Sequence, residues 1–432
     1  MSDTLAVLME DQLAGRLART TGGRLTFTYD EQYRQRDGAT PLSLSLPLQL
    51  ATHGEPPLGA WLWGLLPDND AVLRRWAREF HANAKSAFSL LGTPIGEDCA
   101  GAVRIIQEDR LEDALRRAGA VEWLTEAQVA QRLRDLREDS TAWLGRSFTG
   151  QFSLAGAQAK TALLLEDGKW GVPSGALATT HILKPAVSGL DDHDLNEHLC
   201  LSAARRCELT AARTQISRFA EQTAVLVSRY DRRYQDGRVT RVHQEDLCQA
   251  LGVMPTRKYQ NEGGPGVRQI ASLLRRAMPA RAGKAATRAF ADALAWNWLI
   301  GGTDAHAKNY SLLLAGDQVR LAPLYDIASA LPYASHEREL RLAMSIGGDY
   351  RLAPFNNPWP AAARELGLDA EGLVERVGEL AARAPDALSD AARAEEVVAL
   401  GRDLPATLVD LVGARAARCR QLLTTAPPAI PP

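Results

Sequence analysis

The chain has 432 residues, enough for two or three domains with well-buried cores. Hydrophobic residues make up 46% of it and charged residues 24%, as in an ordinary soluble globular protein. The formal net charge of −2 argues against a protein that binds nucleic acid by charge alone. Only seven of the 50 basic residues are lysines. Each lysine is therefore worth locating, because arginine does not replace a lysine used as a compact point charge.

Cysteine usage and hydropathy narrow the class of protein further. The five cysteines are scattered and never form a C-x-x-C pair, so they indicate a reducing compartment rather than a zinc or disulfide framework. The first residues are acidic and contain no basic segment before an apolar run, unlike a secretory signal. The longest apolar stretch, near residues 60–66, is much shorter than a membrane span. We expect a cytoplasmic protein that does not enter a membrane.

The first 150 residues predict a small α/β module followed by charged helices. Helical periodicity runs from Trp61 to Leu91 and is broken by LLPDND at 65–70. Residues 108–146 are charged and amphipathic, which predicts a helical connector. Period-2 alternation and turn residues predict strands at Leu5–Met9, Leu25–Tyr29, Leu42–Leu48 and Ala102–Ile106.

From residue 150 the pattern predicts a small antiparallel sheet and then mostly helices. The apolar run Ser153–Leu165 meets an E-D-G-K turn, a strong hairpin signal. A helix is expected over 194–206, with Asp194 as its N-cap. Further strands are predicted at Thr179–Pro185 and Thr223–Tyr230, helices at 268–278, 285–300 and on to about 421, a hairpin at 310–324, and a Pro-rich tail at 426–432.

The most informative segment is GGTDAHAKNY at 301–310. Asp304 and Asn309 have the spacing D-x-x-x-x-N, which in phosphoryl transfer lets the Asp orient and deprotonate a hydroxyl while the Asn holds a metal ion. Asp326 follows 22 residues later, after the predicted hairpin, in the order of a kinase metal-binding aspartate. The alternative is a polar turn whose side chains cap neighbouring backbone groups, with Asp326 as a solvated turn residue.

Upstream residues supply what a nucleotide needs. Lys184 ends a strand of the predicted sheet, from which it can reach ATP phosphates, and Glu197 in the next helix is its candidate partner. Ser153–Lys160 contains a glycine and can present backbone N–H groups to phosphate, although it matches neither the G-x-G-x-x-G nor the Walker pattern. The alternative for Lys184 is a surface lysine in a Lys-Pro turn.

Taken together, these segments resemble the HipA family of bacterial serine/threonine kinase toxins. The resemblance runs from the first strand to about residue 420. It rests on PLSLSLPLQL at 41–50, LLPDND at 65–70, SLAGAQAKTALLL at 153–165, THILKP at 180–185, NEHLCLSAA at 196–204, SRYDR at 228–232, HQEDLCQALG at 243–252, GGTDAHAKNYSLLL at 301–314 and LAPLYDIAS at 321–329.

Residue by residue, the resemblance implies the following roles. Asp304 is the catalytic base, His306 and Lys308 complete the catalytic loop, and Asn309 and Asp326 hold Mg²⁺. Lys184 binds the ATP phosphates. The other ATP-binding residues that the family implies are Ala155, Gly156, Ala157, Gln158, Ala159, Lys160, Ser228, Arg229, Tyr230 and Tyr325.

Two further features follow from the family pattern. Ser153 occupies the place of a serine that is autophosphorylated in this family, which ejects the phosphate loop and ends activity. The family often has Glu before Arg-Phe-Asp-Arg where this chain has Ser228-Arg229-Tyr230-Asp231-Arg232, so this chain departs from the family pattern at the adenine-side contacts.

The expected architecture is α+β, with a bilobed kinase-like domain behind an N-terminal module. The module covers 1–107, and the resemblance implies that it docks a helix-turn-helix, HipB-like antitoxin. The helical connector covers 108–149. The kinase domain covers 150–425, with its small antiparallel-sheet N-lobe at about 150–230 and a mostly helical C-lobe at about 231–425. The resemblance implies that operator DNA is reached only through the antitoxin and that the candidate protein substrate is an aminoacyl-tRNA synthetase.

Several alternatives stay open. The chain could act as a catalytically weak co-repressor with the antitoxin on operator DNA, or as a metal-dependent hydrolase using Asp304 and His306. The acidic loop 191–194 is more simply a solvated loop than a metal site. His243, Glu245 and Asp246 resemble a ligand cluster, but adjacent residues point in different directions on a strand or a helix. The arginine-rich run Arg275–Arg288 is most simply a solvated helix face, with DNA contact as the alternative.

Overall fold

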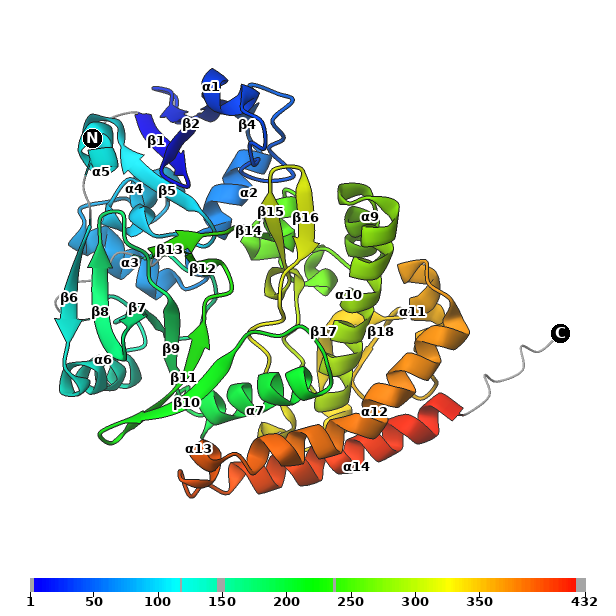
Figure 1. The fold of residues 1–432 in the computed structure, drawn as a ribbon. Helices are drawn as coiled ribbons and strands as arrows, with labels where there is room; N and C mark the ends of the chain where they lie inside the picture. The colour runs from blue at the N-terminus through cyan, green and yellow to red at the C-terminus, as the bar shows by residue number, and fades with distance from the viewer. Residues whose placement is uncertain (1–3, 117–118, 146–151, 236–237, 425–432) are drawn as a thin grey trace. The chain divides into compact units, whose positions relative to one another are not determined.

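The fold is that of a computed structural model, in which the structure describes residues 4–116, 119–145, 152–235 and 238–424. The chain divides into two compact units (Figure 1). Unit 1 contains residues 1–188, 217–257 and 311–319, and unit 2 contains residues 189–216, 258–310 and 320–432. The expected α+β class is confirmed. The Pro-rich tail lies outside the described residues, and the domain boundaries at 107, 149 and 230 stay predictions.

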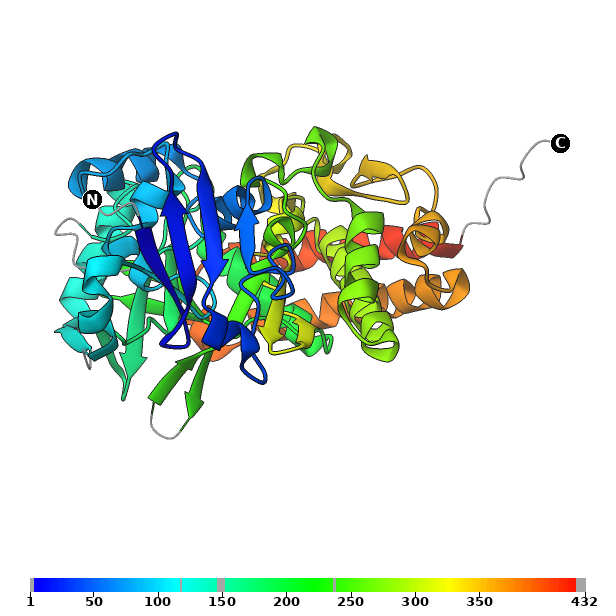
Figure 2. The same ribbon diagram turned by 90° about the horizontal axis from the view of Figure 1, so that it is seen from above.

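The first part of unit 1 is a five-stranded antiparallel sheet in the order β4-β3-β2-β1-β5 (Figure 2). Three of the four strands expected in the first 107 residues are confirmed as β1, β3 and β5. The strand β2 was not predicted, because its sequence QLAGRLAR lacks β-branched and aromatic residues and forms a strand only by pairing with β1 and β3. The strands are β1 (Thr4–Met9), β2 (Gln12–Arg19), β3 (Leu25–Tyr29), β4 (Thr52–Gly54) and β5 (Val103–Gln107).

The strand expected at Leu42–Leu48 is wrong. This segment makes only an isolated bridge between Ser43 and Leu46. Its polar groups bond to another part of unit 1: the Ser43 hydroxyl and the Leu44 N–H both donate to the Glu245 carboxylate, at 2.5 and 2.8 Å. Prolines at both ends of the segment also remove backbone donors that a ladder needs.

Helices of unit 1 pack with this sheet into one core. The helical periodicity over 61–91 is confirmed. It breaks at LLPDND because Asn69 caps the next helix: its side chain accepts from the N–H groups of Ala71 and Val72. The helices are α1 (Glu31–Gln35), α2 (Pro57–Gly64), α3 (Asp70–Glu79) and α4 (Ala87–Leu91).

A six-stranded sheet in the order β10-β11-β9-β7-β8-β6 forms the second layer. The predicted β7–β8 hairpin is confirmed, with Asp167 and Gly168 at its turn at φ of 49° and 74°. The predicted all-helical connector is wrong in part, because β6 lies inside it and pairs with β8, whose free edge it covers. The helix α6 packs on β9 and β11. The bounds are β6 (Ala120–Leu124), β7 (Thr161–Glu166), β8 (Lys169–Ser174), β9 (His181–Pro185), β10 (Thr214–Phe219), β11 (Gln222–Ser228), α5 (Leu111–Arg116) and α6 (Glu126–Glu138).

The remaining strands of unit 1 lead toward the predicted catalytic loop. β12 (Arg232–Gln235) pairs with β13 (Arg238–Arg241), and β14 (His243–Asp246) pairs with β15 (Ser311–Ala315). The expected hairpin at 310–324 is confirmed as β15 and β16 (Gln318–Leu321). After β14, Asp246 caps the short helix α8 (Leu247–Ala250).

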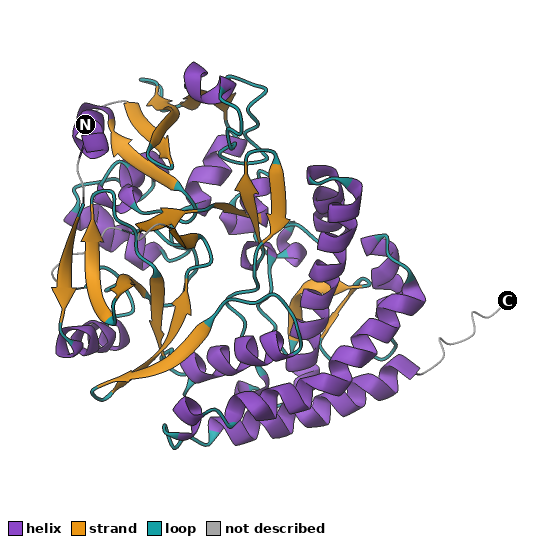
Figure 3. Cartoon of the chain, in the orientation of Figure 1, coloured by secondary structure: helices purple, strands orange, loops and turns teal. Residues whose placement is uncertain are grey.

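Unit 2 is mainly helical (Figure 3), as the periodicity indicates. One detail differs from expectation: Asp192, at φ 55°, occupies the N-cap position of α7, so Asp194 lies buried inside the first turn. The pair β17–β18 was not predicted either. The elements are α7 (His193–Arg206), α9 (Val267–Ala277), α10 (Ala280–Ile300), β17 (Arg341–Ile346), β18 (Asp349–Arg351), α11 (Trp359–Leu366), α12 (Ala370–Ala392), α13 (Glu395–Val398) and α14 (Leu404–Thr424). Within the described part of the chain, none of the helices combines the length and apolarity needed to cross a membrane.

The carboxyl group of Glu245 titrates abnormally because it is completely buried. Burial raises its pKa from 4.5 to about 8, against the lowering effect of its hydrogen bonds to Ser43 and Leu44. Below about pH 4.5 both the folded and the unfolded states hold this proton, whereas between 4.5 and 8 only the folded state does. Deprotonation in the unfolded state therefore lowers the stability of the protein as pH rises through this window.

We expect Glu245→Gln to remove this pH dependence, because glutamine imitates the protonated acid at every pH. The free energy of unfolding of the variant, relative to wild type, should rise by at most about 1.4 kcal/mol per pH unit between pH 5 and 8. Urea unfolding at four pH values measures it, with the exposed Glu262→Gln as control. Parallel wild-type and Glu245→Gln curves would contradict the buried-acid assignment.

Candidate kinase site

The predicted catalytic loop leaves the C-terminus of α10 and leads into β15. Gly301 ends the helix in a left-handed conformation at φ 73°, and the Gly302 N–H donates to the Asn297 carbonyl at 2.7 Å. From there the loop exposes Asp304 but buries His306, Lys308 and Asn309. An exposed carboxylate on a loop fixed by buried neighbours is well placed to meet a substrate hydroxyl.

Asn309 is held by the catalytic loop itself. Its Nδ2 donates to the backbone carbonyl of Asp304 at 2.9 Å. This bond uses the amide nitrogen, and within the described part of the chain the Oδ1 atom accepts no hydrogen bond. Amide and carboxylate oxygens are the ligands that Mg²⁺ takes from proteins. Asn309 therefore fits the metal-binding role that the spacing predicts.

Tyr259 contacts this loop and was not predicted from the sequence. Its hydroxyl donates to Oδ1 of Asp304 at 2.8 Å, and its ring meets that of His306 edge to face, with centroids 5.0 Å apart. It lies 45 residues before Asp304 in the sequence. No local spacing signal links the two residues, so only the packing of unit 2 reveals the contact.

Asp326 and Tyr325 follow the β15–β16 hairpin. The Tyr325 hydroxyl donates to the Lys308 carbonyl at 2.6 Å and so ties this segment to the catalytic loop. Asp326 has φ 56°, a left-handed conformation that is costly for a residue with a side chain. Strain of this kind persists where the surrounding structure enforces it, often at functional sites.

In unit 1, the predicted phosphate loop is an irregular segment before β7. Gly156 has φ 102°, a backbone conformation that residues with a side chain rarely adopt, and a Cβ there would also displace Nζ of Lys160, which would lie 2.6 Å away. Lys160 donates to the Ala155 carbonyl at 2.7 Å and lies 4.9 Å from the centroid of the Trp143 ring. These contacts of the Lys160 ammonium group hold the loop in its conformation.

Gln158 is the member of this loop that best fits an anion. Its Nε2 is buried, yet it has no hydrogen-bond partner among the described residues. An orphaned buried donor is costly, and a phosphate oxygen would satisfy it. Ala155, Ala157 and Ala159 can contribute only backbone groups, which remains a prediction.

Lys184 and Glu197 are both buried, at 5% and 1% exposed. Lys184 lies on β9, opposite Val225 of β11, so the alternative of a surface lysine in a turn is wrong. Glu197 lies on α7 in unit 2. Their pairing stays a prediction.

The Ser228–Tyr230 segment, predicted to line the adenine site, ends β11. Ser228 shares a hydrogen bond of 3.2 Å with Nε2 of His181. Arg229 is 5% exposed, and all of its side-chain nitrogens bond within a buried network, so only its backbone remains for nucleotide. The Tyr230 hydroxyl donates to Gln244. The Arg229 side chain is therefore structural, and the predicted ATP contact of this segment stays a prediction for its backbone.

Ser153, the predicted autophosphorylation site, is fully buried. Its hydroxyl donates to the Leu65 carbonyl at 2.7 Å, and its N–H donates to the Asp98 carbonyl at 2.9 Å. No kinase can reach the hydroxyl in this position. Phosphorylation of Ser153 therefore requires this end of the loop to leave its place.

The other candidate ligand clusters have structural explanations. His243 shares a hydrogen bond with the Leu42 carbonyl, Glu245 holds the Ser43 segment, and Asp246 caps α8. Among the described residues no group of three or more His, Cys, Asp or Glu side chains is arranged to hold a metal ion, the acidic loop 191–194 included. The basic side chains between Arg275 and Arg288 are exposed on α9 and α10, as a solvated helix face requires.

Comparison with known proteins supports the interpretation of these loops as a kinase site. The HipA N-terminal domain matches residues 5–106, and the HipA-like C-terminal domain matches residues 152–388. A Sinorhizobium fredii protein named "Putative kinase Y4mE" is 32% identical over 89% of this chain and 93% of its own length. The serine/threonine-protein kinase toxin HipA of Shewanella oneidensis is 29% identical over 90% of this chain and 89% of its own length.

Solved structures agree as well. A chain in the complex of Shewanella oneidensis HipA, HipB and operator DNA matches with a TM-score of 0.81 and 25% identity, over 98% of this chain and 100% of that one. The fold and the loops described above define a protein-kinase-like enzyme. The chain belongs to the HipA family, and it is a HipA-like serine/threonine kinase of the toxin–antitoxin class.

The hydrogen bond from Tyr259 predicts a test of the catalytic loop. Tyr259→Phe removes the hydroxyl that orients Asp304 but keeps the ring against His306. We expect the rate of phosphoryl transfer to fall roughly tenfold, with the KM for ATP unchanged, because a hydrogen bond to a carboxylate is worth about 1.5–3 kcal/mol.

The matched control is Tyr234→Phe, which removes an exposed hydroxyl that donates to the Leu165 carbonyl. Equal rates for the two variants would show that Tyr259 does not position the base.

Proposed function

We propose that this protein transfers the γ-phosphoryl group of MgATP to a serine or threonine of a protein substrate, and that it autophosphorylates at Ser153. The observation that carries the proposal is the catalytic loop, in which Asn309 is bonded to the backbone of Asp304 and leaves its Oδ1 available to a cation. Sequence spacing, local geometry and family membership all support the same role for this loop.

In the proposed reaction, Asp304 orients the substrate hydroxyl and accepts its proton as the oxygen attacks the γ-phosphorus. The bond between this phosphorus and the β–γ bridging oxygen breaks, and ADP leaves. Tyr259 holds one carboxylate oxygen of Asp304, which leaves the other to receive the proton. His306 and Lys308, buried in the loop, fix its conformation. Asn309 and Asp326 are the residues that would hold Mg²⁺, which when bound neutralises charge on the β- and γ-oxygens.

Residues of unit 1 hold the nucleotide in this proposal. Lys184 contacts the phosphates as a point charge, and Gln158 together with backbone N–H groups of the loop 155–160 donates to phosphate oxygens. The backbone of Ser228–Tyr230 lines the adenine side, and Tyr325 is a further predicted nucleotide contact. Catalysis then consists of positioning and electrostatic stabilisation.

The partners proposed here follow those of the relatives. The Shewanella oneidensis structure contains HipA with HipB and operator DNA, which supports a HipB-like, helix-turn-helix antitoxin that docks on the N-terminal module and supplies the DNA contacts. An aminoacyl-tRNA synthetase is the proposed substrate. All five cysteines are free thiols, which fits a reducing compartment such as the cytoplasm.

The main alternative is a catalytically weak co-repressor that acts only with the antitoxin on DNA. The presence of Lys184, Asp304, Asn309 and Asp326 speaks against it, because a co-repressor needs none of these groups. The two functions differ in one measurable product, the phosphoryl group on protein.

We expect Asp304→Asn and Asp326→Asn to lower phosphoryl transfer at least about 100-fold while leaving the circular dichroism spectrum unchanged. Transfer of label from γ-labelled ATP to Ser153 measures the rate. Asp317→Asn, on the exposed turn between β15 and β16, is the control and should retain full activity. No labelling of the wild-type protein would favour the co-repressor, and near-normal turnover in either variant would refute the assigned roles.

The burial of Ser153 leads to a second expectation. Ser153→Asp places a carboxylate against the Leu65 carbonyl in a dry site, so the loop should leave and ATP affinity should fall at least about tenfold. Ser153→Ala, which is neutral and small, should bind ATP as the wild type does. Titration calorimetry with MgATP measures both, and equal affinities for the two variants would contradict the coupling of Ser153 burial to nucleotide binding.

A further inference from the structure

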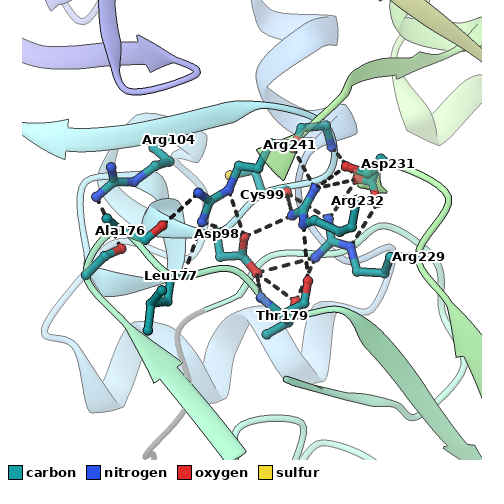
Figure 4. Close-up of polar contacts among 12 residues, drawn as sticks. Asp98, Cys99, Arg104, Ala176, Leu177, Thr179, Arg229, Asp231, Arg232 and Arg241 are labelled. Carbon is teal, nitrogen blue, oxygen red and sulfur yellow. Dashed lines mark hydrogen bonds and ion pairs between the residues drawn. The ribbon is translucent and has the colours of Figure 1, made fainter. Parts of the chain in front are cut away.

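Two nucleotide-binding segments of unit 1 are held by one residue of the N-terminal module. Asp98 follows α4 and is 2% exposed. Its backbone carbonyl accepts from the N–H of Ser153, at the start of the phosphate loop. Its carboxylate lies among three arginines that follow β11, as Figure 4 shows. No local sequence pattern indicates this contact, because Asp98 lies 131 residues before Arg229.

The carboxylate of Asp98 is fully used. Its Oδ1 accepts from Arg232 at 2.9 Å and from Arg241 at 3.1 Å. Its Oδ2 accepts from the Thr179 hydroxyl at 2.7 Å and from Arg229 at 3.3 Å. Burial alone would raise the pKa of Asp98, but the charges of Arg232, Arg229 and Arg241 outweigh it and hold the pKa below its ordinary value.

The same network fixes the Ser228–Tyr230 segment. Arg229 also bonds to both oxygens of Asp231, at 3.0 and 2.8 Å, and the Gly101 N–H donates to Asp231 at 2.7 Å. Arg229 and Arg232 both donate to the Cys99 carbonyl. The side chain of Arg229 thus bonds the predicted adenine-side segment both to the carboxylate of Asp98 and to the backbone carbonyl of Cys99.

The phosphate loop meets a second segment of the module. The Leu65 carbonyl accepts from the Ser153 hydroxyl, the Asp68 N–H donates to the Gly156 carbonyl at 3.1 Å, and Asn69 donates to the Ala157 carbonyl at 3.4 Å. These residues belong to the LLPDND motif, for which the proposed phosphoryl transfer supplies no role. Cys99 also forms a backbone bridge with Ser153.

We propose that Asp98 is a positioning residue for ATP. From the N-terminal module it fixes both the start of the phosphate loop and the adenine-side end of β11. The module is therefore part of the nucleotide-binding apparatus. The inference rests on the proposed function, because it assigns these two segments to ATP. It adds that a residue outside the kinase domain sets the affinity for nucleotide. Loss of the Asp98 carboxylate frees Arg229 and Arg232 to move, and the segment that they anchor moves with them.

The test removes one charge pair and keeps the net charge of the network. Asp98→Asn alone would leave buried arginines short of a partner and could prevent folding. The double variant Asp98→Asn/Arg241→Met removes one negative and one positive charge together. Its matched control is Asp11→Asn/Arg104→Met, which removes another ion pair of the same module, bonded to the Gly175 carbonyl and to neither nucleotide segment.

We expect the Asp98 double variant to bind MgATP at least about tenfold more weakly than wild type by calorimetry. The rate of ATP turnover at saturating MgATP should stay within about twofold of wild type, since Asp304 and the metal ligands are untouched. Cys99, whose thiol pKa burial raises to about 12, should become open to alkylation, as mass spectrometry reports. The control variant should match wild type in all three measurements.

A second variant covers failure of the first to fold. Thr179→Val removes only the hydroxyl that joins Asp98 to Arg229, and it should weaken MgATP binding about threefold. Wild-type affinity in a folded variant, with Cys99 still protected, would overturn the role of Asp98 and leave the proposed function standing. A wild-type protein that binds no MgATP would overturn both.

Discussion

Three guanidinium groups, those of Arg229, Arg232 and Arg241, share the buried carboxylate of Asp98. Charges at this depth are costly to desolvate, and their mutual attraction compensates only if nearly every donor and acceptor is satisfied. Here the carbonyls of Cys99, Gly101, Ala176, Leu177 and Thr179 supply the remaining acceptors. Such a network tolerates one geometry, so it fixes the spacing of the chain segments that enter it.

That constraint explains why unit 1 combines residues far apart in the chain. The network joins the segment after α4, the segment between β8 and β9, and the residues that run from the end of β11 to β13, while LLPDND supports the phosphate loop. The segments that meet ATP in the proposed function are therefore anchored on residues of the N-terminal module. A protein that binds the module is in a position to act on nucleotide binding without touching the catalytic loop.

In the catalytic loop of unit 2, single hydrogen bonds rather than buried ion pairs hold the side chains of Asp304 and Asn309. Asn309 is held by one hydrogen bond to the backbone of Asp304, and Asp304 itself by one from Tyr259. The exposed Asp304 carboxylate thus stands on a loop whose other functional side chains are buried. Rigid support beneath an exposed base is what proton transfer to a correctly placed carboxylate requires.

The sequence alone determined the motifs whose members are close in the chain. Local spacing and backbone preference predict the D-x-x-x-x-N loop, the β7–β8 turn at Asp167-Gly168, the glycine of the phosphate loop and most strands of both sheets. The order of these motifs along the chain indicates the family. Only the tertiary structure decided that Leu42–Leu48 is no strand, that β6 interrupts the connector, that Arg229 is structural, and that Tyr259 and Asp98 support the site. Each of these depends on a partner at least 45 residues away, such as Glu245 for Ser43 or Asp304 for Tyr259. Hydrogen bonds and ion pairs over such separations form when the chain folds back on itself, and local patterns do not encode them.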